Sequence, residues 1–344
     1  MINTFKSQLN DINSGISRPK NINLTTVNKL GVLGSGLMGH GITYVSALSG
    51  IEVVMTDSNQ ENAEKGFSRI KNILHSIVKK GQLSQENAKN VLNKITVTDD
   101  YNNLQDCDLI IEAVFEDRDL KGKVTAQAEK IMDRNGIFAS NTSTLPISGL
   151  AEKSIRPEKF IGIHFFSPVH KMKLVEIIKG EKTNDETIAK AFDYVLKIKK
   201  IPIVVNDSRG FYTSRVFSTY TNEGLALLAE GNHPQEIETA GKKAGMPVGP
   251  LAVIDEINLG LVSQIRKQTR KDLATEGKEL PLIPADQVID LMTEKINRLG
   301  RAQGGGFYEY PENGKKYLWP ELKTHFPIAK DPLTKDQMIE RILF

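Results

Sequence analysis

Two side chains able to exchange protons interrupt two apolar segments in the middle of the sequence. Residues 160–166 carry His164, and residues 173–178 carry Glu176. The apolar, β-branched and aromatic composition of both segments predicts buried strands, and a chain return between them would bring the imidazole and the carboxylate together. A carboxylate beside an imidazole fixes its tautomer and stabilises its charged form. The pair could therefore take a proton from an alcohol, although a purely structural His–Glu pair is the alternative.

A glycine-rich loop lies nearer the N-terminus, between a predicted strand and a predicted helix. The first glycine of a G-x-G-x-x-G loop permits a tight turn, the second lets a diphosphate approach the backbone, and the third lets helix and strand pack closely. Free amides at the start of the helix then attract the diphosphate. We predict a dinucleotide site at this loop, which consists of Gly34, Ser35, Gly36, Leu37, Met38 and Gly39.

An acidic residue, Asp57, ends the second predicted strand. A carboxylate at this place hydrogen-bonds a ribose 2′-hydroxyl and would repel a 2′-phosphate, which favours NAD over NADP. The alternative is that the glycines form only a tight turn and Asp57 only caps a strand. Oxidation of an alcohol with NAD needs a base for the hydroxyl proton and a nicotinamide for the hydride, and His164 and the glycine loop together would supply both.

A hydroxyl-rich turn, in the sequence FASNTSTLPI, follows another predicted strand. The carboxyl ends of parallel strands meet at one edge of a sheet, so we expect this turn at the same end as the glycine loop. Ser143 or Asn141 would there hydrogen-bond a substrate oxygen. An ordinary cap of the next helix is the alternative.

The elements that position these residues form two regions. Strands and helices alternate through the first ~200 residues, which predicts a Rossmann-type α/β domain with a parallel sheet covered on both faces. After Val205 the pattern changes to amphipathic helices without strands, and Asp207 would cap the first of them. We therefore predict a linker-like extension (1–26), a nucleotide-binding domain (27–206), a helical domain (207–310) and a tail (311–344).

Composition excludes several classes of protein. The net charge is +3 and no dense basic run is present, which argues against a nucleic-acid binder. The single cysteine, Cys107, excludes an internal disulfide and is expected as a packed thiol. The six histidines form no ligand pair, so no metal site is predicted. No signal peptide and no membrane span is visible, which favours a cytoplasmic location.

Five ordered motifs resemble the L-3-hydroxyacyl-CoA dehydrogenase family. The similarity covers roughly residues 28–310 and is carried by GVLGSGLMGHGI, DLIIEAVFEDRDLK, FASNTSTLPI, GIHFFSPVHKMKLVEII and GFYTSR. The resemblance is strongest to the dehydrogenase part of multifunctional fatty-acid oxidation proteins. It implies a helical C-terminal domain like that of 6-phosphogluconate dehydrogenase, a homodimer formed through that domain, and a hydratase/isomerase domain or thiolase subunit as partner. The ends of the chain resemble a linker and the start of a second helical repeat, so we expect a segment of a longer protein.

The resemblance also implies roles for individual residues. His164 would take the proton of the 3-hydroxyl group, Glu176 would orient His164, and Ser143 would bind the substrate oxygen near the nicotinamide. Glu116, Lys121 and Ser167 fall at cofactor-contacting positions, with solvated helix charges as the alternative for the first two. Lys71, Lys79 and Lys80 would meet coenzyme A phosphates unless they form a solvated basic face. Arg301 would approach a phosphate, with a surface turn as the slightly preferred alternative.

Two positions depart from the family. Asparagine is usual at Ser214 and frequent at Ser167, and the asparagine at the first position helps to hold the thioester. Serine keeps a donor and an acceptor but has a shorter reach. We expect reduced or retuned turnover, which asparagine at Ser214 should raise.

Two other interpretations stay open. One is a β-hydroxyacid dehydrogenase of related architecture, whose catalytic lysine would lie in the helical domain. The other is a catalytically weak segment that binds NAD and acyl-CoA. Dependence on the CoA thioester separates the first from the leading interpretation, and NADH binding without turnover would indicate the second.

Overall fold

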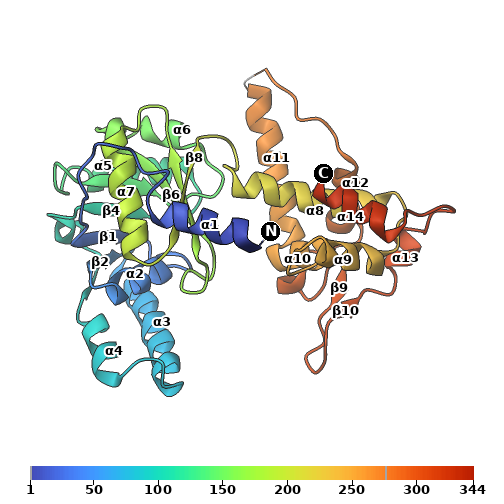
Figure 1. The fold of residues 1–344 in the computed structure, drawn as a ribbon, viewed down its shortest axis with the longest axis horizontal. Coiled ribbons are helices and arrows are strands. Elements are labelled where there is room, and N and C mark those ends of the chain that lie inside the picture. The colour runs from blue at the N-terminus through green and yellow to red at the C-terminus, as the bar shows by residue number, and fades with distance from the viewer. Residues whose placement is uncertain (1, 276) are drawn as a thin grey trace. The chain divides into compact units, whose positions relative to one another are not determined.

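A computed structural model describes residues 2–275 and 277–344. The chain divides into two units, Met1–Ser214 and Arg215–Phe344, which we describe separately. The division lies a few residues beyond the predicted boundary at 206–207, because the connection from the last strand continues to the start of the next helix (Figure 1).

The first unit is built on one eight-stranded sheet in the order β3-β2-β1-β4-β5-β6-β7-β8. The strands are β1 (Lys29–Leu33), β2 (Glu52–Thr56), β3 (Ile95–Thr98), β4 (Leu109–Glu112), β5 (Ile137–Ser140), β6 (Phe160–Phe165), β7 (Leu174–Lys179) and β8 (Ile201–Asn206). Every neighbouring pair is parallel except β6 and β7, which are antiparallel. The order of the first six strands, reversed at β1, is that of a dinucleotide-binding fold.

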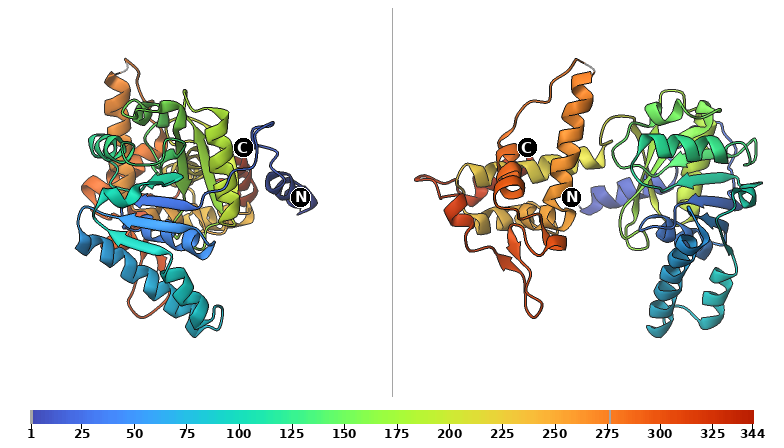
Figure 2. Two further views of the ribbon diagram at one scale, coloured as in Figure 1. Left: turned by 90° about the vertical axis from the view of Figure 1, so that its left-hand side faces the viewer. Right: turned by 180° about the vertical axis from the view of Figure 1, so that it is seen from behind.

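Helices cover both faces of this sheet, as predicted (Figures 1 and 2). They are α2 (Gly39–Leu48), α3 (Gln60–Lys79), α4 (Gln85–Leu92), α5 (Arg118–Ala128), α6 (Ile147–Ala151) and α7 (Asp185–Lys197), with 3₁₀ turns at Tyr101–Leu104 and Pro157–Lys159. One apolar cluster joins the sheet to α2, α3 and α7, and another joins the opposite face to α5 and α6. The strands therefore bury both faces, which is the physical reason for their nearly continuous apolar sequences.

The N-terminal extension differs from the prediction, because it contains the helix α1 (Ile2–Asn13). The segment after α1 is held to α7. The Arg18 guanidinium donates to both carboxylate oxygens of Asp193, over 2.7 and 2.9 Å, and Thr25 donates to the same carboxylate through its backbone and its hydroxyl. Residues 18–25 are thus part of this unit and not a free linker.

The second unit is helical, with one small addition. Its helices are α8 (Thr213–Ala229), which begins two residues before the boundary, α9 (Pro234–Lys243), α10 (Pro250–Ile257), α11 (Leu259–Thr275), α12 (Pro284–Asp290), a π-helical turn (Leu291–Lys295), a 3₁₀ turn (Arg301–Gln303), α13 (Leu322–His325) and α14 (Lys335–Leu343). The strands β9 (Tyr308–Glu309) and β10 (Tyr317–Leu318) form an antiparallel pair. The expectation of no strands after Val205 is therefore wrong for these two short segments.

Residues 311–344 belong to the core of the second unit and do not form a tail. Trp319, Leu322, Phe326 and Met338 are all buried in its apolar cluster. The α14 helix packs on α9. The polar, proline-containing sequence between these apolar residues hid their periodicity.

Candidate active site

The sheet register places His164 directly opposite Glu176. The two residues are partners on the antiparallel strands β6 and β7, and the His164 Nδ1 atom lies 2.8 Å from Glu176 Oε2. The predicted juxtaposition is confirmed. Both side chains are buried, with 7% of His164 and 0% of Glu176 exposed.

Glu176 is held ionised by the residues that lead into α8. Its Oε1 atom accepts hydrogen bonds from the backbone N–H groups of Tyr212 (3.1 Å) and Thr213 (2.8 Å), and its Oε2 atom accepts one from Thr213 Oγ1 (2.6 Å). Burial alone would raise the pKa of Glu176, but the hydrogen bonds from His164 and Thr213 outweigh it and hold the pKa below its ordinary value. An ionised carboxylate only accepts, so the hydrogen on His164 lies on Nδ1.

In the neutral imidazole, the second nitrogen of His164, Nε2, is then an acceptor. No hydrogen bond joins Nε2 to another residue in the described part of the chain. The imidazole is flanked by the rings of Phe166 and Phe211, whose centroids are 4.5 and 6.0 Å from its own. Phe211 is buried and has a φ of 48°, a strained conformation for an aromatic residue, which occurs where the chain turns to aim the next two N–H groups at Glu176.

The three glycines of the loop after β1 meet different constraints. Gly34 has a φ of 95°, and a Cβ on it would lie 2.6 Å from the Ala113 carbonyl oxygen. A Cβ on Gly39 would lie 1.7 Å from the Gly34 carbonyl oxygen, whereas one on Gly36 would meet no atom within 4 Å. Gly34 and Gly39 are therefore required by the protein's own packing, whereas Gly36 faces open space just before α2. These residues fit a cofactor diphosphate.

The loop is tied to Asp57, which directly follows β2. Ser35 donates its backbone N–H and its hydroxyl to Asp57 Oδ2, each over 2.7 Å. Burial would raise the pKa of Asp57, but these bonds and those from Ser58 hold it below its ordinary value. The carboxylate thus lies beside the loop and is charged at neutral pH. Its contact with a ribose stays a prediction, as do the contacts of exposed Leu37 and half-buried Met38.

Glu116 organises the hydroxyl-rich turn after β5. Its Oε1 atom accepts bonds from the backbone N–H groups of Ser143 (3.2 Å) and Thr144 (3.3 Å) and from the hydroxyls of Thr142 and Thr144. The Ser143 side chain is exposed, and no hydrogen bond to its hydroxyl is found among the described residues. Asn141 is occupied differently, because its Oδ1 atom accepts the N–H of Phe165 at the end of β6 (2.9 Å). Ser143 is therefore freer than Asn141 to meet a ligand.

Lys121 is not a solvated helix charge. Only 2% of it is exposed, and its ammonium lies 2.8 Å from Glu112 Oε1 and 3.2 Å from Glu116 Oε2. Glu112 also accepts the Ser140 hydroxyl (2.8 Å) and the Val114 N–H (2.8 Å). The ammonium thus holds Glu116 in place, and a direct contact of Lys121 with the cofactor stays a prediction.

The remaining predicted residues lie in varied surroundings. Ser167 is exposed on the loop after β6, and Ser214 is half-buried next to Thr213. Lys71, Lys79 and Lys80 are exposed on and after α3, which fits a solvated basic face. Arg301 belongs to the second unit, where it pairs with Glu256 over 2.9 Å on the surface.

Two partners were not predicted from the sequence: Thr213, which contacts Glu176, and Glu112, which contacts Lys121. Thr213 was passed over because a hydroxyl at the start of a helix is a common capping signal, and Glu112 because it ends an apolar strand. The prediction also misplaced Asp207, whose carboxylate accepts the N–H groups of Ile147 (2.9 Å) and Ser148 (2.7 Å) at the start of α6, not of α8. Cys107, by contrast, is buried as predicted, and burial raises its pKa to about 12.

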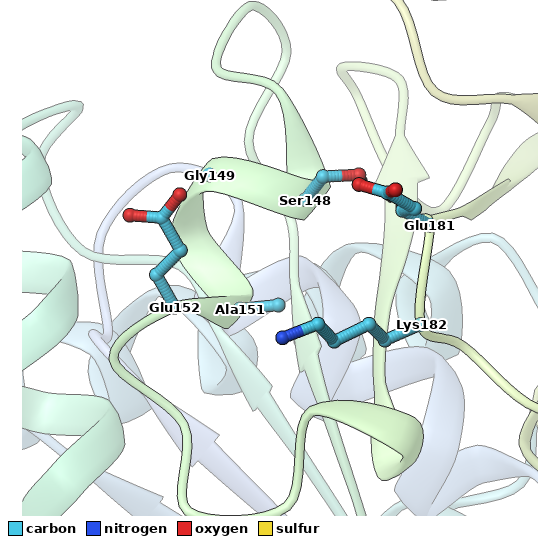
Figure 3. A pocket seen from close by; sticks show the side chains of 6 residues that line it. All are labelled: Ser148, Gly149, Ala151, Glu152, Glu181 and Lys182. Carbon is cyan, nitrogen blue, oxygen red and sulfur yellow. Dashed lines mark hydrogen bonds between the residues drawn. The ribbon is translucent and has the colours of Figure 1, made fainter.

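A surface hollow of about 200 Å³ lies between α6 and the turn after β7. Figure 3 shows Ser148 beside Glu181 at its rim and the Lys182 side chain running below α6. Its lining contains none of the predicted site residues. Among the described residues, no cluster of metal-ligating side chains is found, and every helix is too short or too polar to cross a bilayer.

Comparison with known families identifies the family to which the chain belongs. The model of the 3-hydroxyacyl-CoA dehydrogenase NAD-binding domain matches residues 29–208, and that of the C-terminal domain of the same family matches residues 210–310. The chain belongs to the 3-hydroxyacyl-CoA dehydrogenase family. Membership fixes the cofactor as NAD and the class of protein as an oxidoreductase.

Two relatives place this 3-hydroxyacyl-CoA dehydrogenase chain within the family. It is 38% identical over 296 residues to the fatty acid oxidation complex subunit alpha of Shewanella loihica, a match that covers 86% of this chain and 41% of that protein. The chain thus spans about two fifths of the length of such relatives. The crystal structure of (S)-3-hydroxybutyryl-CoA dehydrogenase PaaH1 from Ralstonia eutropha is 34% identical, with a TM-score of 0.77, over 83% of this chain and 100% of that one.

A third similarity extends further along the chain. The dehydrogenase part of multifunctional enzyme 1 from C. elegans is 26% identical, with a TM-score of 0.63, over 94% of this chain and 73% of that chain. This similarity agrees with the resemblance to the dehydrogenase part of multifunctional proteins.

Proposed function

We propose that this chain oxidises an L-3-hydroxyacyl-CoA to the 3-oxoacyl-CoA with NAD, as a step of fatty-acid β-oxidation in the cytoplasm. The observation that carries the proposal is the buried His164–Glu176 pair, whose Nε2 atom is left free in an NAD-binding domain. Support for the substrate class comes from PaaH1, which is described as a 3-hydroxybutyryl-CoA dehydrogenase.

The residues of the chain would divide the work as follows. Nε2 of His164 accepts the proton of the substrate's 3-hydroxyl group, and the ionised Glu176 stabilises the imidazolium that forms. The Ser143 hydroxyl donates a hydrogen bond to the substrate oxygen. Gly36 and the start of α2 would hold the diphosphate of NAD, and Asp57 would hold its ribose. When bound, NAD supplies the acceptor for the hydride that leaves C3.

Further parts of the proposal concern the whole protein. We infer a homodimer formed through the helical unit, and a hydratase/isomerase domain or thiolase subunit as a functional partner. Support comes from the relatives named as subunits of fatty acid oxidation complexes.

The test measures consumption of NADH in the presence of acetoacetyl-CoA and, separately, of free acetoacetate. A parallel series measures consumption of NADPH with the same two compounds. We expect turnover with the CoA thioester and NADH only. Equal turnover of the free acid would indicate a β-hydroxyacid dehydrogenase instead. If NADH binds in a calorimeter but neither compound is reduced, the chain is a binding segment, and asparagine at Ser214 becomes the next variant.

A further inference from the structure

A buried lysine anchors the loop that connects the His164 strand to the Glu176 strand. Lys200 directly precedes β8 and is 7% exposed. Its ammonium donates to the carbonyl oxygens of Val169 and Met172, the latter over 2.6 Å, on the loop between β6 and β7. Two backbone amides, those of Lys171 and Met172, close this loop as a tight turn by donating to the Pro168 carbonyl.

The same loop packs on the first turns of the nucleotide-binding helix α2. A Cβ on Gly41 would lie 2.8 Å from the Val169 Cβ atom, so the Val169 side chain fills the place that this glycine leaves. One turn further along the helix, the Tyr44 ring meets the His170 ring edge to face, with centroids 6.3 Å apart. The loop therefore has one side against α2 and its carbonyls on the Lys200 ammonium.

Lys200 has no carboxylate partner in the part of the chain that the structure describes, although buried charges usually have one. Its two hydrogen-bond partners are neutral carbonyls, and the charged group that acts on it most is another cation, Lys173. Burial, together with Lys173, lowers the pKa of Lys200 to about 8. An ammonium without a carboxylate partner is costly inside a protein, and here the two carbonyls that it holds are what offset that cost.

We propose that Lys200 is a positioning residue for the cofactor site: its ammonium holds the 166–172 loop against α2, so that the loop is preorganised when NAD binds. The loop carries Ser167, and it begins directly after the strand of His164. A loop that must become ordered during binding lowers affinity, whereas one already held in place does not. The inference rests on the proposed function only for its effect on turnover, because NADH binding reports on it directly.

The test compares Lys200→Met with Lys197→Met, which removes an exposed ammonium at the end of α7. At a temperature where both variants are folded, we expect Lys200→Met to raise the Kd for NADH about tenfold and to speed hydrogen exchange at the Lys171 and Met172 amides. Lys197→Met should leave both unchanged. Lys200→Arg keeps a cationic donor and should recover part of the affinity.

Unchanged NADH affinity in folded Lys200→Met would overturn the proposal, even if unfolding occurred at a lower temperature, because that pattern indicates a structural role alone. If Lys200→Met does not fold, Val169→Ala replaces it. That variant keeps the ammonium, both carbonyls and the Cβ atom of residue 169 but loses the two methyl groups that also pack on Gly41, and it should raise the Kd severalfold. An unchanged Kd there would equally contradict the proposal. Absence of turnover in the wild-type protein would count against the proposed function. The Kd values for NADH would still test the role of Lys200.

Discussion

Two buried glutamates lie near the same edge of the sheet, and their partners give them different properties. Glu176 is 0% exposed and faces an imidazole, while Glu112 is 1% exposed and faces the ammonium of Lys121. The imidazole keeps a nitrogen, Nε2, that has no hydrogen-bond partner among the described residues, whereas the ammonium is paired with the carboxylates of Glu112 and Glu116. Burial of a carboxylate is thus no sign of catalysis by itself. What matters is whether its partner can still react.

The comparison predicts its largest effect at His164. Replacing His164 with alanine removes the base, and we expect the turnover number to fall by about 10³-fold or more, at the upper part of the range for general-base catalysis. The Kd for NADH should stay close to the wild-type value, because the glycine loop is unchanged. Steady-state kinetics with acetoacetyl-CoA and calorimetry with NADH measure the two quantities. A variant with a tenth of wild-type turnover would mean that another group is the base.

The second effect concerns stability. Lys121→Met leaves the carboxylates of Glu112 and Glu116 without their cation, and breaking a buried pair in this way costs about 3–5 kcal/mol of the free energy of unfolding. Urea denaturation provides the measurement. The matched control is Lys123→Met, on the same helix but exposed, which should change the free energy by less than about 0.5 kcal/mol. Equal stability of the two variants would contradict the structural role of Lys121.

A smaller effect is expected at the hydroxyl-rich turn. Ser143→Ala removes a hydroxyl that has no hydrogen bond among the described residues, so the melting temperature should hardly change. We expect kcat/KM for acetoacetyl-CoA to fall about tenfold, which corresponds to one hydrogen bond of about 1.4 kcal/mol to the substrate oxygen. Loss of stability without loss of kcat/KM would reverse the assignment and make Ser143 part of the turn alone.

The smallest expected effect concerns the pH dependence of the free energy of unfolding, to which Glu176 contributes. The folded protein holds the pKa of Glu176 below the ordinary value of 4.5, so the unfolded chain takes up its proton first as the pH falls. The stability that Glu176 contributes is therefore complete above pH 4.5 and is lost as the pH falls through the lower, folded-state pKa. Glu176→Gln should show a shallower loss of stability below pH 4.5 than the wild type. Identical slopes in denaturation series across this range would show that Glu176 is not charged in the fold.

The features that could be predicted from the sequence are those that depend on short segments of it. The alternation of apolar strands and helices predicted the sheet, and a polar residue inside each of two apolar runs marked His164 and Glu176. The glycine spacing predicted the loop, because Gly34 and Gly39 each meet a local steric requirement there.

Features that depend on distant partners escaped prediction. Lys121 and Glu116 look like ordinary charges at the start of a helix until the fold brings Glu112 and the 142–144 turn beside them. Asp207 is of a residue type that often caps the following helix, but the fold places its carboxylate at the start of α6. The β9–β10 pair is two residues long on each side, too short for any periodicity to show.

The measurement that tests the comparison most directly is the turnover number of Glu176→Gln beside that of Glu112→Gln, with acetoacetyl-CoA and NADH at a temperature where both variants are folded. We predict that Glu176→Gln loses about a hundredfold in turnover, because the imidazolium loses its counter-charge, and that Glu112→Gln keeps most of it while unfolding more easily. Equal losses of turnover, or a larger loss in Glu112→Gln, would contradict the account that only the glutamate facing His164 serves the chemistry.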